Sequence, residues 1–463
     1  MKPETIITGT PVTLSELLNA RSRRARRQKE LLCRPGAHSL ISFSMNMPGE
    51  IKRFPLLLSA FEEGLKAIRE RIPHNDIRHY EESRENTGPE ALFLLSSEAA
   101  FVKRITASIE ESHTLGRLFD MDVLDTSGVS LSRSTLGLPP RTCLVCGENA
   151  KICARSKRHS MELILWRIAR ILNDYFRNQA ADLAAACAVR SLLYEVSATP
   201  KPGLVDRNNS GSHRNMDFFT FLDSSAALIP WFRDFFCIGW DCCQETEDNL
   251  FDRLRFAGQQ AEKSMFSATG GINTHKGLVF SFAILCGALG KVHAGTRSPL
   301  NSRDVISLCQ RLGAHSLPDF SASSSAKTAG EQCHAAYGIT GARGEAAAGF
   351  PSALTLGLPA LKHWLHEGFS LNDSSVLALL TILTKVDDTN MIHRGGRAMA
   401  LKCKKEAADI LSDIAADSFR EKLTALDEGF IKRNLSPGGC ADLLAVSLMF
   451  LFLESSHLTT PFN

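Results

Sequence analysis

Hydrophobic and polar residues follow two different periodicities along the chain, and the change falls near residue 160. Residues 40–45 alternate apolar and small polar side chains, and residues 118–125 show the same period of two, so both segments are predicted strands. Residues 13–32 and 55–72 carry the residue types of helices. The first part of the chain is therefore predicted to be a mixed α/β domain.

From about residue 160 onward, stretches rich in Ala, Leu, Arg and Glu are separated by loops that contain Gly and Pro. Little period-two alternation remains, so this part is predicted to be an all-α helical domain. Residues 161–176 and 180–196 are predicted to form two helices with three residues between them. Because no Pro-, Gly- or Ser-rich linker separates them, the pattern alone locates the domain boundary only to within tens of residues.

The length of the chain independently favours two domains. Its 463 residues exceed the ~250–300 at which a single hydrophobic core usually stops growing, so we expect two domains joined near residue 180. Hydrophobic residues make up 44% of the chain, enough to supply a core for each domain. A formal net charge of +3 gives no global field that would attract nucleic acid or an anionic membrane, so neither partner is expected.

The cysteine content bears on the compartment. Thirteen cysteines are an odd number, and the first residues contain no apolar signal core, so we expect reduced thiols and a cytoplasmic protein. The longest apolar run, residues 443–453, is shorter than the ~20 residues that a membrane helix needs. We predict that this run is a buried helix.

Two carboxylates in the second predicted strand are the first candidates for chemistry. Asp120 and Asp122 stand two positions apart, so their side chains project from the same face of a strand. Such a pair can share a Mg²⁺ ion that also binds phosphate oxygens, although the same spacing occurs on solvated strand edges.

A cluster of sulfur and imidazole side chains follows this strand. Cys143, Cys146, Cys153 and His159 have the donor types of a tetrahedral zinc site, and the first spacing fits a zinc knuckle. The alternative is a packed turn of reduced thiols.

The order of these blocks resembles a known family. Residues 116–125, followed by Arg141-x-Cys143-x-x-Cys146 and the Cys153 to His159 segment, resemble the apo-citrate lyase phosphoribosyl-dephospho-CoA transferases over residues 10–178. The resemblance implies a nucleotidyltransferase-like α/β domain. It implies that a serine of the acyl carrier (γ) subunit of citrate lyase attacks the activated prosthetic group and releases pyrophosphate. Asp120 and Asp122 would then be the catalytic Mg²⁺ ligands.

A basic run, residues 21–29, lies in the first predicted helix. It is typical of a solvated helix face or of a surface that docks an acidic carrier protein, and less so of nucleic-acid binding, because no aromatic residues are interleaved.

Four loop motifs in the helical part combine glycine with charged residues, as sites for phosphorylated ligands do. Each motif has an ordinary alternative, such as a helix cap or a hydrogen-bonded polar residue. The candidates for nucleotide or phosphate binding are Lys201, Gly270, Gly271, Asn273, His275, Lys276, Arg343 and Arg394. The candidates for catalysis are Glu345, Asp387 and Asp388.

Together, in this order, the four motifs resemble the triphosphoribosyl-dephospho-CoA synthases over residues 181–456. Asn215 stands where that family is expected to have an acidic residue. The resemblance implies that ATP and 3′-dephospho-CoA are the substrates, that the triphosphoribosyl group moves to the 2′-hydroxyl, and that adenine leaves. Carboxylates would stabilise the oxocarbenium character at the ribose and accept a proton.

The two expectations support each other, because the product of the second reaction is the substrate of the first. The chain is thus expected to be a bifunctional transferase. Two alternatives stay open at this point. In one, the N-terminal half is an inactive or regulatory module fused to the synthase. In the other, the basic helix and the Cys/His cluster form a zinc-bearing nucleic-acid-binding module attached to a metal-dependent phosphohydrolase-like helical domain.

Overall fold

The computed structural model describes residues 3–295, 299–322, 329–414 and 419–462. The chain divides into two compact units, Met1–Phe176 and Arg177–Asn463. The division falls inside one continuous helix, α6 (Met161–Ser197). The prediction of two separate helices in this region was wrong, because the residues between them, Arg177, Asn178 and Gln179, include no Gly or Pro that would interrupt helical hydrogen bonding.

The N-terminal unit contains both helices and strands. Its elements before α6 are α1 (Pro3–Ile6), α2 (Leu14–Leu32), β1 (Ser39–Met45), α3 (Pro55–Arg71), η1 (His74–Asp76), β2 (Ile77–Glu85), β3 (Gly88–Leu95), α4 (Ala99–Ser112), η2 (Gly116–Leu118), β4 (Phe119–Asp125), η3 (Ser134–Leu136) and α5 (Ala150–Arg155).

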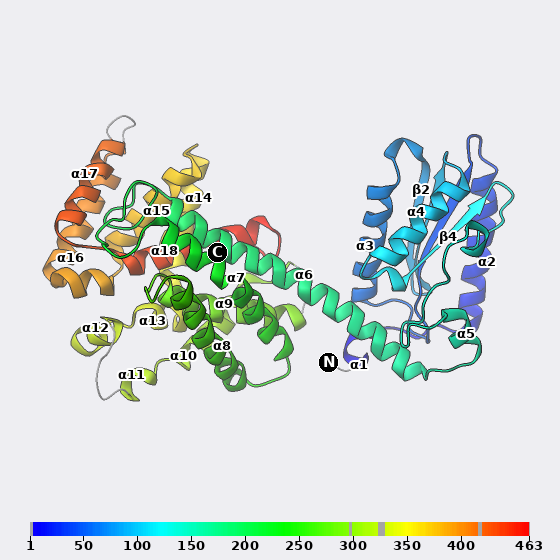
Figure 1. Ribbon diagram of the computed structural model, residues 1–463, viewed down its shortest axis with the longest axis horizontal. Helices are drawn as coiled ribbons and strands as arrows, with labels where there is room; N and C mark the ends of the chain where they lie inside the picture. Colours follow the sequence, from blue (N-terminus) through cyan, green and yellow to red (C-terminus); the bar gives the residue numbers. More distant parts are fainter. Residues whose placement is uncertain (1–2, 296–298, 323–328, 415–418, 463) are drawn as a thin grey trace. The chain divides into compact units, whose positions relative to one another are not determined.

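The four strands form one antiparallel sheet in the order β2-β3-β1-β4, with helices on both faces (Figure 1). Residues of β1 point alternately to the two faces. Ile41 and Phe43 join the larger core with α3 and α4, whereas Leu40 joins a smaller cluster with Leu31 of α2. The predicted strands at β1 and β4 are confirmed, and the hairpin of β2 and β3 was not predicted.

The start of α2 shows why its sequence forms a helix there. Thr13 accepts a hydrogen bond from the backbone of Glu16, and the Glu16 carboxylate accepts one from the backbone of Thr13, which is a capping box. The predicted helix at residues 13–32 is thus confirmed, with Thr13 as its N-cap and Leu14 as its first helical residue.

In the described residues of the C-terminal unit, the regular elements are all helices, and loops connect them. After α6 its elements are α7 (Phe218–Asp241), α8 (Glu247–Ala268), α9 (Lys276–Gly295), α10 (Ser302–Ala314), α11 (Asp319–Ala322), α12 (Ala329–Tyr337), α13 (Gly341–Ala347), the π-helix η4 (Ala353–Gly357), α14 (Leu358–His366), α15 (Leu371–Lys385), α16 (Thr389–Leu411), α17 (Phe419–Lys432) and α18 (Gly438–Ser455).

Close helix packing in this unit depends on glycine. A side chain at Gly239 of α7 would meet the carbonyl oxygen of Gly287 in α9 at 1.9 Å, so the two backbones are in direct contact. In α16, Gly396 has a positive φ of 77°, and the element is in fact two helices joined at that kink.

Two helices are long and apolar enough to cross a membrane, within Lys276–Ala294 and Gly438–Ser455. In each, 67% of that stretch is buried inside the unit, and core helices of water-soluble proteins pass the same test. The prediction that residues 443–453 form a buried helix is confirmed by α18, whose leucines are almost all in the core.

Candidate functional sites in the two units

The carboxylates of β4 lie on an edge strand of the sheet. Asp120 is opposite Ser44 of β1 and Asp122 is opposite Ser42, so both project from the face that α2 covers. The smaller core cluster on this face reaches β4 only at Leu124. The Asp120 side chain is 47% exposed and Asp122 is exposed, so this pair is open to solvent.

Side chains satisfy the free edge of β4. The N–H of Met121 donates to Glu110 Oε1 at 3.0 Å, and Lys103 Nζ donates to the Met121 carbonyl at 3.0 Å. Burial lowers the pKa of Lys103. Glu110 and Lys103 thus occupy the outward-facing N–H and carbonyl of Met121. These groups of β4 are not available to pair with a further strand.

Arg141 approaches the carboxylate pair from the loop after β4. Its guanidinium donates to the Phe119 carbonyl at 2.5 Å and to Asp120 Oδ1 at 3.3 Å. The pKa of Asp120 is raised by partial burial and by the charge of Asp122, while Arg141 opposes the shift. Two adjacent carboxylates favour a cation between them, and oxygen donors are those that Mg²⁺ prefers.

The four predicted zinc ligands are brought together. The sulfur atoms of Cys143, Cys146 and Cys153 and a ring nitrogen of His159 all lie within 4.8 Å of one another. Cys146 Sγ is 3.5 Å from Cys153 Sγ and 3.3 Å from His159 Nε2.

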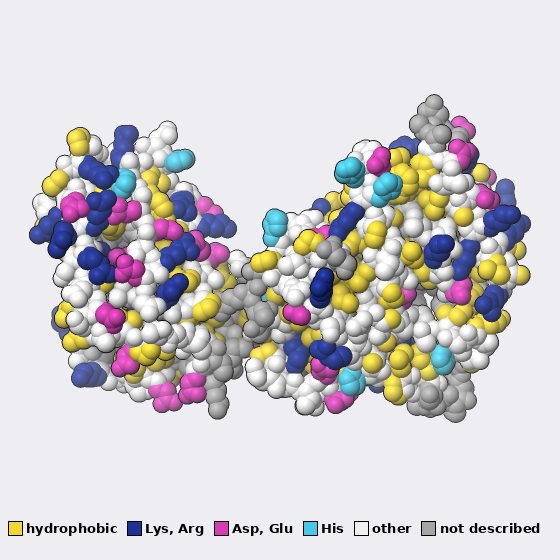
Figure 2. Space-filling view, turned by 180° about the vertical axis from the view of Figure 1, so that it is seen from behind, with side chains coloured by type: hydrophobic (Ala, Val, Ile, Leu, Met, Phe, Trp, Pro, Cys, Tyr) yellow, Lys and Arg dark blue, Asp and Glu magenta, His cyan; other side chains and the backbone are white. Residues whose placement is uncertain are grey.

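The basic run of α2 is largely used inside its own unit. Arg23, Arg24 and Arg27 pair with Glu85, Glu90 and Glu81 of the sheet, respectively. Figure 2 shows basic and acidic side chains interspersed over one face of this unit. Among the described residues no ion pair forms at the other basic positions of the run, which are exposed: Arg21, Arg26 and Lys29.

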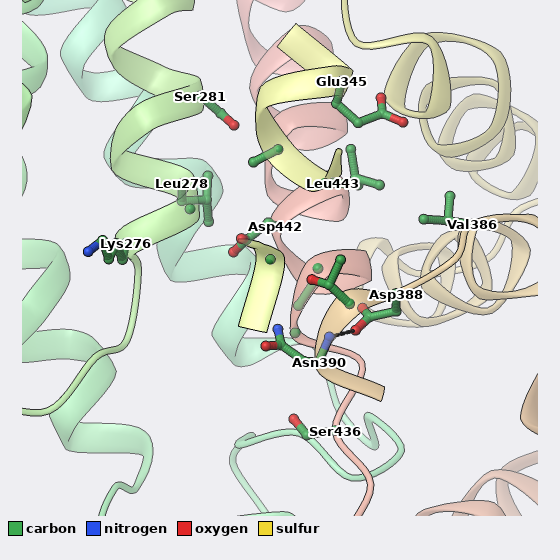
Figure 3. A pocket seen from close by; sticks show the side chains of 18 of the residues that line it. Lys276, Leu278, Ser281, Glu345, Val386, Asp388, Asn390, Ser436, Asp442 and Leu443 are labelled. Carbon is green, nitrogen blue, oxygen red and sulfur yellow. Dashed lines mark hydrogen bonds between the residues drawn. The ribbon is translucent and has the colours of Figure 1, made fainter. Parts of the chain in front are cut away.

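In the C-terminal unit the predicted motifs converge on one pocket of about 1080 Å³ (Figure 3). The pocket is lined by nearly every candidate residue of this half: Lys201, Gly271, Asn273, His275, Lys276, Arg343, Glu345, Asp387, Asp388 and Arg394. Gly270 is the one candidate outside the lining. Segments up to about 190 residues apart in the sequence therefore share one site.

The Gly270-Gly271 pair ends a helix. Both residues have positive φ, 64° and 88°, and the Gly271 N–H bonds to the carbonyl of Phe266 near the end of α8 at 2.7 Å. The Gly271 amide is thus used in a helix cap, the ordinary alternative to phosphate binding. Asn273 in turn accepts the N–H of Lys276 at the start of α9.

The three predicted carboxylates have different surroundings. Asp388 is 3% exposed and accepts backbone N–H groups from Asn390, Met391 and Cys440, so it caps α16 and anchors the start of α18. Glu345 accepts hydrogen bonds from Ser352.

Burial raises the pKa of both Asp388 and Glu345, against these hydrogen bonds. Asp387 pairs with Lys404 at 2.6 Å and is more exposed.

Asp442 was not among the predicted site residues. It lies one turn into α18, beside the turn of α9 that carries Lys276 and Leu278 (Figure 3). A side chain at Gly277 would meet Asp442 Oδ2 at 2.5 Å. No described residue donates a hydrogen bond to Asp442, and burial, with the charges of Glu195 and Asp388, raises its pKa well above the usual range.

The signal for Asp442 was present in the sequence as a lone acidic residue at the start of the longest apolar run. Acidic residues are common near the N-terminal ends of helices, so the sequence does not distinguish Asp442 from them. The fold shows that Asp442 lines the pocket.

Glu195 was also missed. It forms a buried ion pair with Lys201, whose side chain is 1% exposed, and the loop of Lys201 is fixed because Asp206 accepts the Lys201 N–H at 2.8 Å. Burial raises the pKa of Glu195, and the Lys201 ammonium opposes this shift.

His275 is buried and neutral. Its Nδ1 is 2.7 Å from the Ser224 hydroxyl, and Nε2 has no hydrogen-bond partner among the described residues. Burial, with the charge of Lys201, lowers its pKa to about 3. Because the Ser224 hydroxyl accepts from Thr274, it is free to donate to Nδ1, which leaves the proton on Nε2 as a donor.

Three further cations line the pocket, and two of them have a carboxylate nearby, Glu262 for Lys276 and Asp319 for Arg343. Lys276 is 3.4 Å from Glu262 and its side chain is 45% exposed. Arg343 packs over the Phe320 ring, and its Nη1 is buried without a partner. Arg394 donates to the Ser212 carbonyl.

One unit has an open carboxylate pair on an edge strand, and the other has a pocket lined by cations and carboxylates; both arrangements are typical of enzymes that act on phosphorylated substrates. Residues 12–175 match the family model of the apo-citrate lyase phosphoribosyl-dephospho-CoA transferases. Residues 181–460 match that of the ATP:dephospho-CoA triphosphoribosyl transferases. The chain belongs to the family of fused proteins in which the first of these enzymes precedes the second.

Full-length relatives have the same arrangement. The chain is 36% identical over 461 residues to a protein named CitXG from Haemophilus influenzae, which covers 96% of this chain and 97% of the relative. It is 36% identical over 465 residues to protein CitXG from Leuconostoc mesenteroides.

A Streptococcus mutans protein, named a probable 2-(5′′-triphosphoribosyl)-3′-dephosphocoenzyme-A synthase, is 40% identical over 280 residues, which is 58% of this chain and 95% of that protein. The chain is thus a bifunctional transferase. Its C-terminal part makes the triphosphoribosyl-dephospho-CoA precursor, and its N-terminal part transfers the prosthetic group to apo-citrate lyase.

Proposed function

We propose that the two reactions take place at the two sites described above, within residues 181–456 for the synthase and 10–178 for the transferase. The observation that carries the proposal is the convergence of four distant motifs on one pocket in the C-terminal unit. ATP and 3′-dephospho-CoA are its proposed substrates, and Lys276, Arg343 and Arg394 supply the positive charge for their phosphates.

The synthase step replaces the bond between ribose C1′ and adenine by a bond to the 2′-hydroxyl oxygen of dephospho-CoA. The hydroxyl proton needs an acceptor, and adenine needs a proton to leave. We assign the acceptor role to Asp442, because no described residue donates to its carboxylate, and because Asp388 is already engaged by three backbone N–H groups.

Glu345, Asp387 and Asp388 remain proposed site residues beside Asp442. Glu345 is held by Ser352, so it presents a fixed negative charge that can stabilise positive charge on the ribose. His275, with Nε2 as a donor, is a neutral hydrogen-bonding group for the substrate or for adenine. Lys201, Gly271 and Asn273 already form hydrogen bonds within the unit, so we assign them the role of shaping and anchoring the site. Gly270 is adjacent to Gly271 and lies outside the pocket lining.

The transferase step joins a serine oxygen of the citrate lyase acyl carrier (γ) subunit to the phosphate that bears the prosthetic group, and pyrophosphate leaves. The open position of Asp120 and Asp122 supports a protein substrate, because a serine on a folded carrier can reach them. Arg141 adds a cation next to this pair, at 3.3 Å from Asp120.

Two metals belong to the proposal. Mg²⁺ would be held by Asp120 and Asp122 and would neutralise charge on phosphate oxygens when bound. Zn²⁺ would be held by the Cys/His cluster, where four protein ligands leave no open position for substrate. The thirteen free cysteines support a reducing, cytoplasmic location.

The test is to incubate the purified chain with ATP, Mg²⁺, 3′-dephospho-CoA and the apo-form of the carrier subunit. We expect free adenine in the supernatant and a carrier whose mass increases by the phosphoribosyl-dephospho-CoA group. Adenine release without a carrier adduct would contradict the transferase assignment alone. The absence of both products would contradict the proposal as a whole.

A further inference from the structure

The segment between β4 and α6 has a defined path although it has almost no core of its own. Between residues 126 and 160, Cys153 is the only buried residue, and regular structure is limited to η3 and the six residues of α5. Leu131 and Leu144 contact the core of the unit only as partly buried side chains. A segment with so little apolar burial needs a crosslink to offset the entropy lost on ordering.

The Cys/His cluster has the dimensions of such a crosslink. Tetrahedral zinc, with bonds of about 2.3 Å to sulfur and about 2.05 Å to nitrogen, separates its ligands by roughly 3.8 Å for S···S and 3.5 Å for S···N. The corresponding distances are 3.5 Å from Cys146 Sγ to Cys153 Sγ and 3.3 Å from Cys146 Sγ to His159 Nε2. These two values agree to within a few tenths of an ångström, and the other donor pairs lie within 4.8 Å of one another.

The backbone between the first two cysteines has the form of a metal-binding turn. The N–H of Val145 points at Cys143 Sγ at 3.4 Å, which stabilises a thiolate there. Gly147 follows with φ of 76°, and its N–H bonds to the Cys143 carbonyl at 3.2 Å. A bridge between Thr142 and Asn149 closes the turn.

The turn is also attached to the carboxylate pair. Arg141, two residues before Cys143, contacts Phe119 and Asp120 through its guanidinium. Arg117, next to β4, donates to the carbonyl of Thr142. Arg141 and Thr142, which directly precede Cys143, are therefore tied to β4 and its flank, and Arg141 places its positive charge next to Asp120.

We propose that Cys143, Cys146, Cys153 and His159 bind one structural zinc ion, and that this ion holds Arg141 in place beside Asp120. Arg141 is thus a positioning residue for the carboxylates, and the cluster is a fold-stabilising element and not a catalytic metal centre. The zinc site stands on the donor geometry alone, whereas its effect on transfer rests on the proposed function.

The experiment uses the full chain purified without chelators. Zinc per chain is measured by inductively coupled plasma mass spectrometry, and tetrahedral thiolate coordination by the visible absorption of the Co²⁺-substituted protein. Cys153→Ser is compared with Cys33→Ser, which removes an exposed cysteine outside the cluster. Adenine release by the other half of the same chain is an internal control for the amount of chain and the folding of the C-terminal unit.

We expect one zinc ion per chain in the wild type and in Cys33→Ser, and none in Cys153→Ser, whose transfer to the carrier falls at least roughly tenfold while adenine release is unchanged. Arg141→Ala should keep zinc and lose transfer, with partial rescue by Arg141→Lys. These two variants separate the role of Arg141 from a general failure of the unit to fold.

Zinc near zero in the wild type, or a disulfide between Cys146 and Cys153, would overturn the metal site. Full transfer by Cys153→Ser without zinc, or by Arg141→Ala, would overturn the positioning role. If the wild type holds one zinc ion but transfers nothing to the carrier, the proposed transferase assignment fails and the metal site stands.

Discussion

The two units expose their reactive groups in opposite ways. In the N-terminal unit, Asp120 and Asp122 lie open on an edge strand with Arg141 beside them, whereas three arginines of α2 pair with glutamates of β2 and β3. In the C-terminal unit, Glu195, Asp388 and Asp442 lie together in a pocket of about 1080 Å³ where burial raises their pKa values. The difference fits the size of the proposed substrates, because a folded carrier needs an accessible surface and small nucleotides can be enclosed.

The largest effect is expected at the open site. Asp122→Asn removes a charge that the proposed metal and phosphate require, so transfer to the carrier should fall by about 10³-fold. Adenine release should not change, because it occurs in the other unit. Carrier mass spectrometry and adenine chromatography on the same sample measure both, and Glu85→Gln on the opposite edge strand is the control. Equal loss of both activities would mean that the two units are not independent.

At the enclosed site, Asp442→Asn should reduce adenine release by about 10²- to 10⁴-fold, since it removes the proposed proton acceptor. Transfer from supplied triphosphoribosyl-dephospho-CoA should be intact. The control is Asp413→Asn, which changes an exposed aspartate that pairs with Lys422 outside the pocket. Normal adenine release by Asp442→Asn would remove this residue from the mechanism.

The same variant should increase stability. Because the pKa of Asp442 is raised in the folded chain, its ionisation favours unfolding, and the stability it contributes is lost as pH rises through the folded pKa. Asp442→Asn should therefore have a higher melting temperature than the wild type at neutral pH, and the difference should vanish below about pH 4. A difference independent of pH would show that burial of this carboxylate costs no stability.

Lys201→Met should destabilise the C-terminal unit by about 3–5 kcal/mol, because it leaves Glu195 buried without its partner. Urea unfolding followed by tryptophan fluorescence is suitable, since Trp231, Trp240 and Trp364 all lie in this unit. The double variant Lys201→Met/Glu195→Leu should recover most of the loss. If the double variant is as unstable as the single one, the ion pair is not the cause.

The smallest effect is expected on α2. Arg26→Ala removes an exposed cation that has no ion-pair partner among the described residues, and should weaken carrier binding about two- to fivefold at low salt. Arg23→Ala/Glu85→Ala removes a pair of opposite charges together and should leave binding unchanged. Titrations of labelled carrier at two salt concentrations compare them, and equal affinities for Arg26→Ala and the wild type would exclude docking at that residue.

Local sequence patterns predicted several of the helices and strands of this protein. The alternation at β1 and β4, the capping residues of α2 and the apolar run of α18 each act over neighbouring positions, so their elements were predictable. The hairpin of β2 and β3 was not, because several polar residues stand on β2, an edge strand that is only partly buried. The spacing of Asp120 and Asp122 predicted a shared face because a strand has a period of two.

Only the tertiary structure decided which charges are available. Arg23 and Lys201 look like free cations in the sequence, yet each is paired with a glutamate that packing brings to it. Asp442 looks like an ordinary helix end, yet α9 and α16 enclose it in the pocket. The chemistry of a carboxylate or an ammonium group depends on its solvation and its neighbours, and these are set by residues far away in the chain.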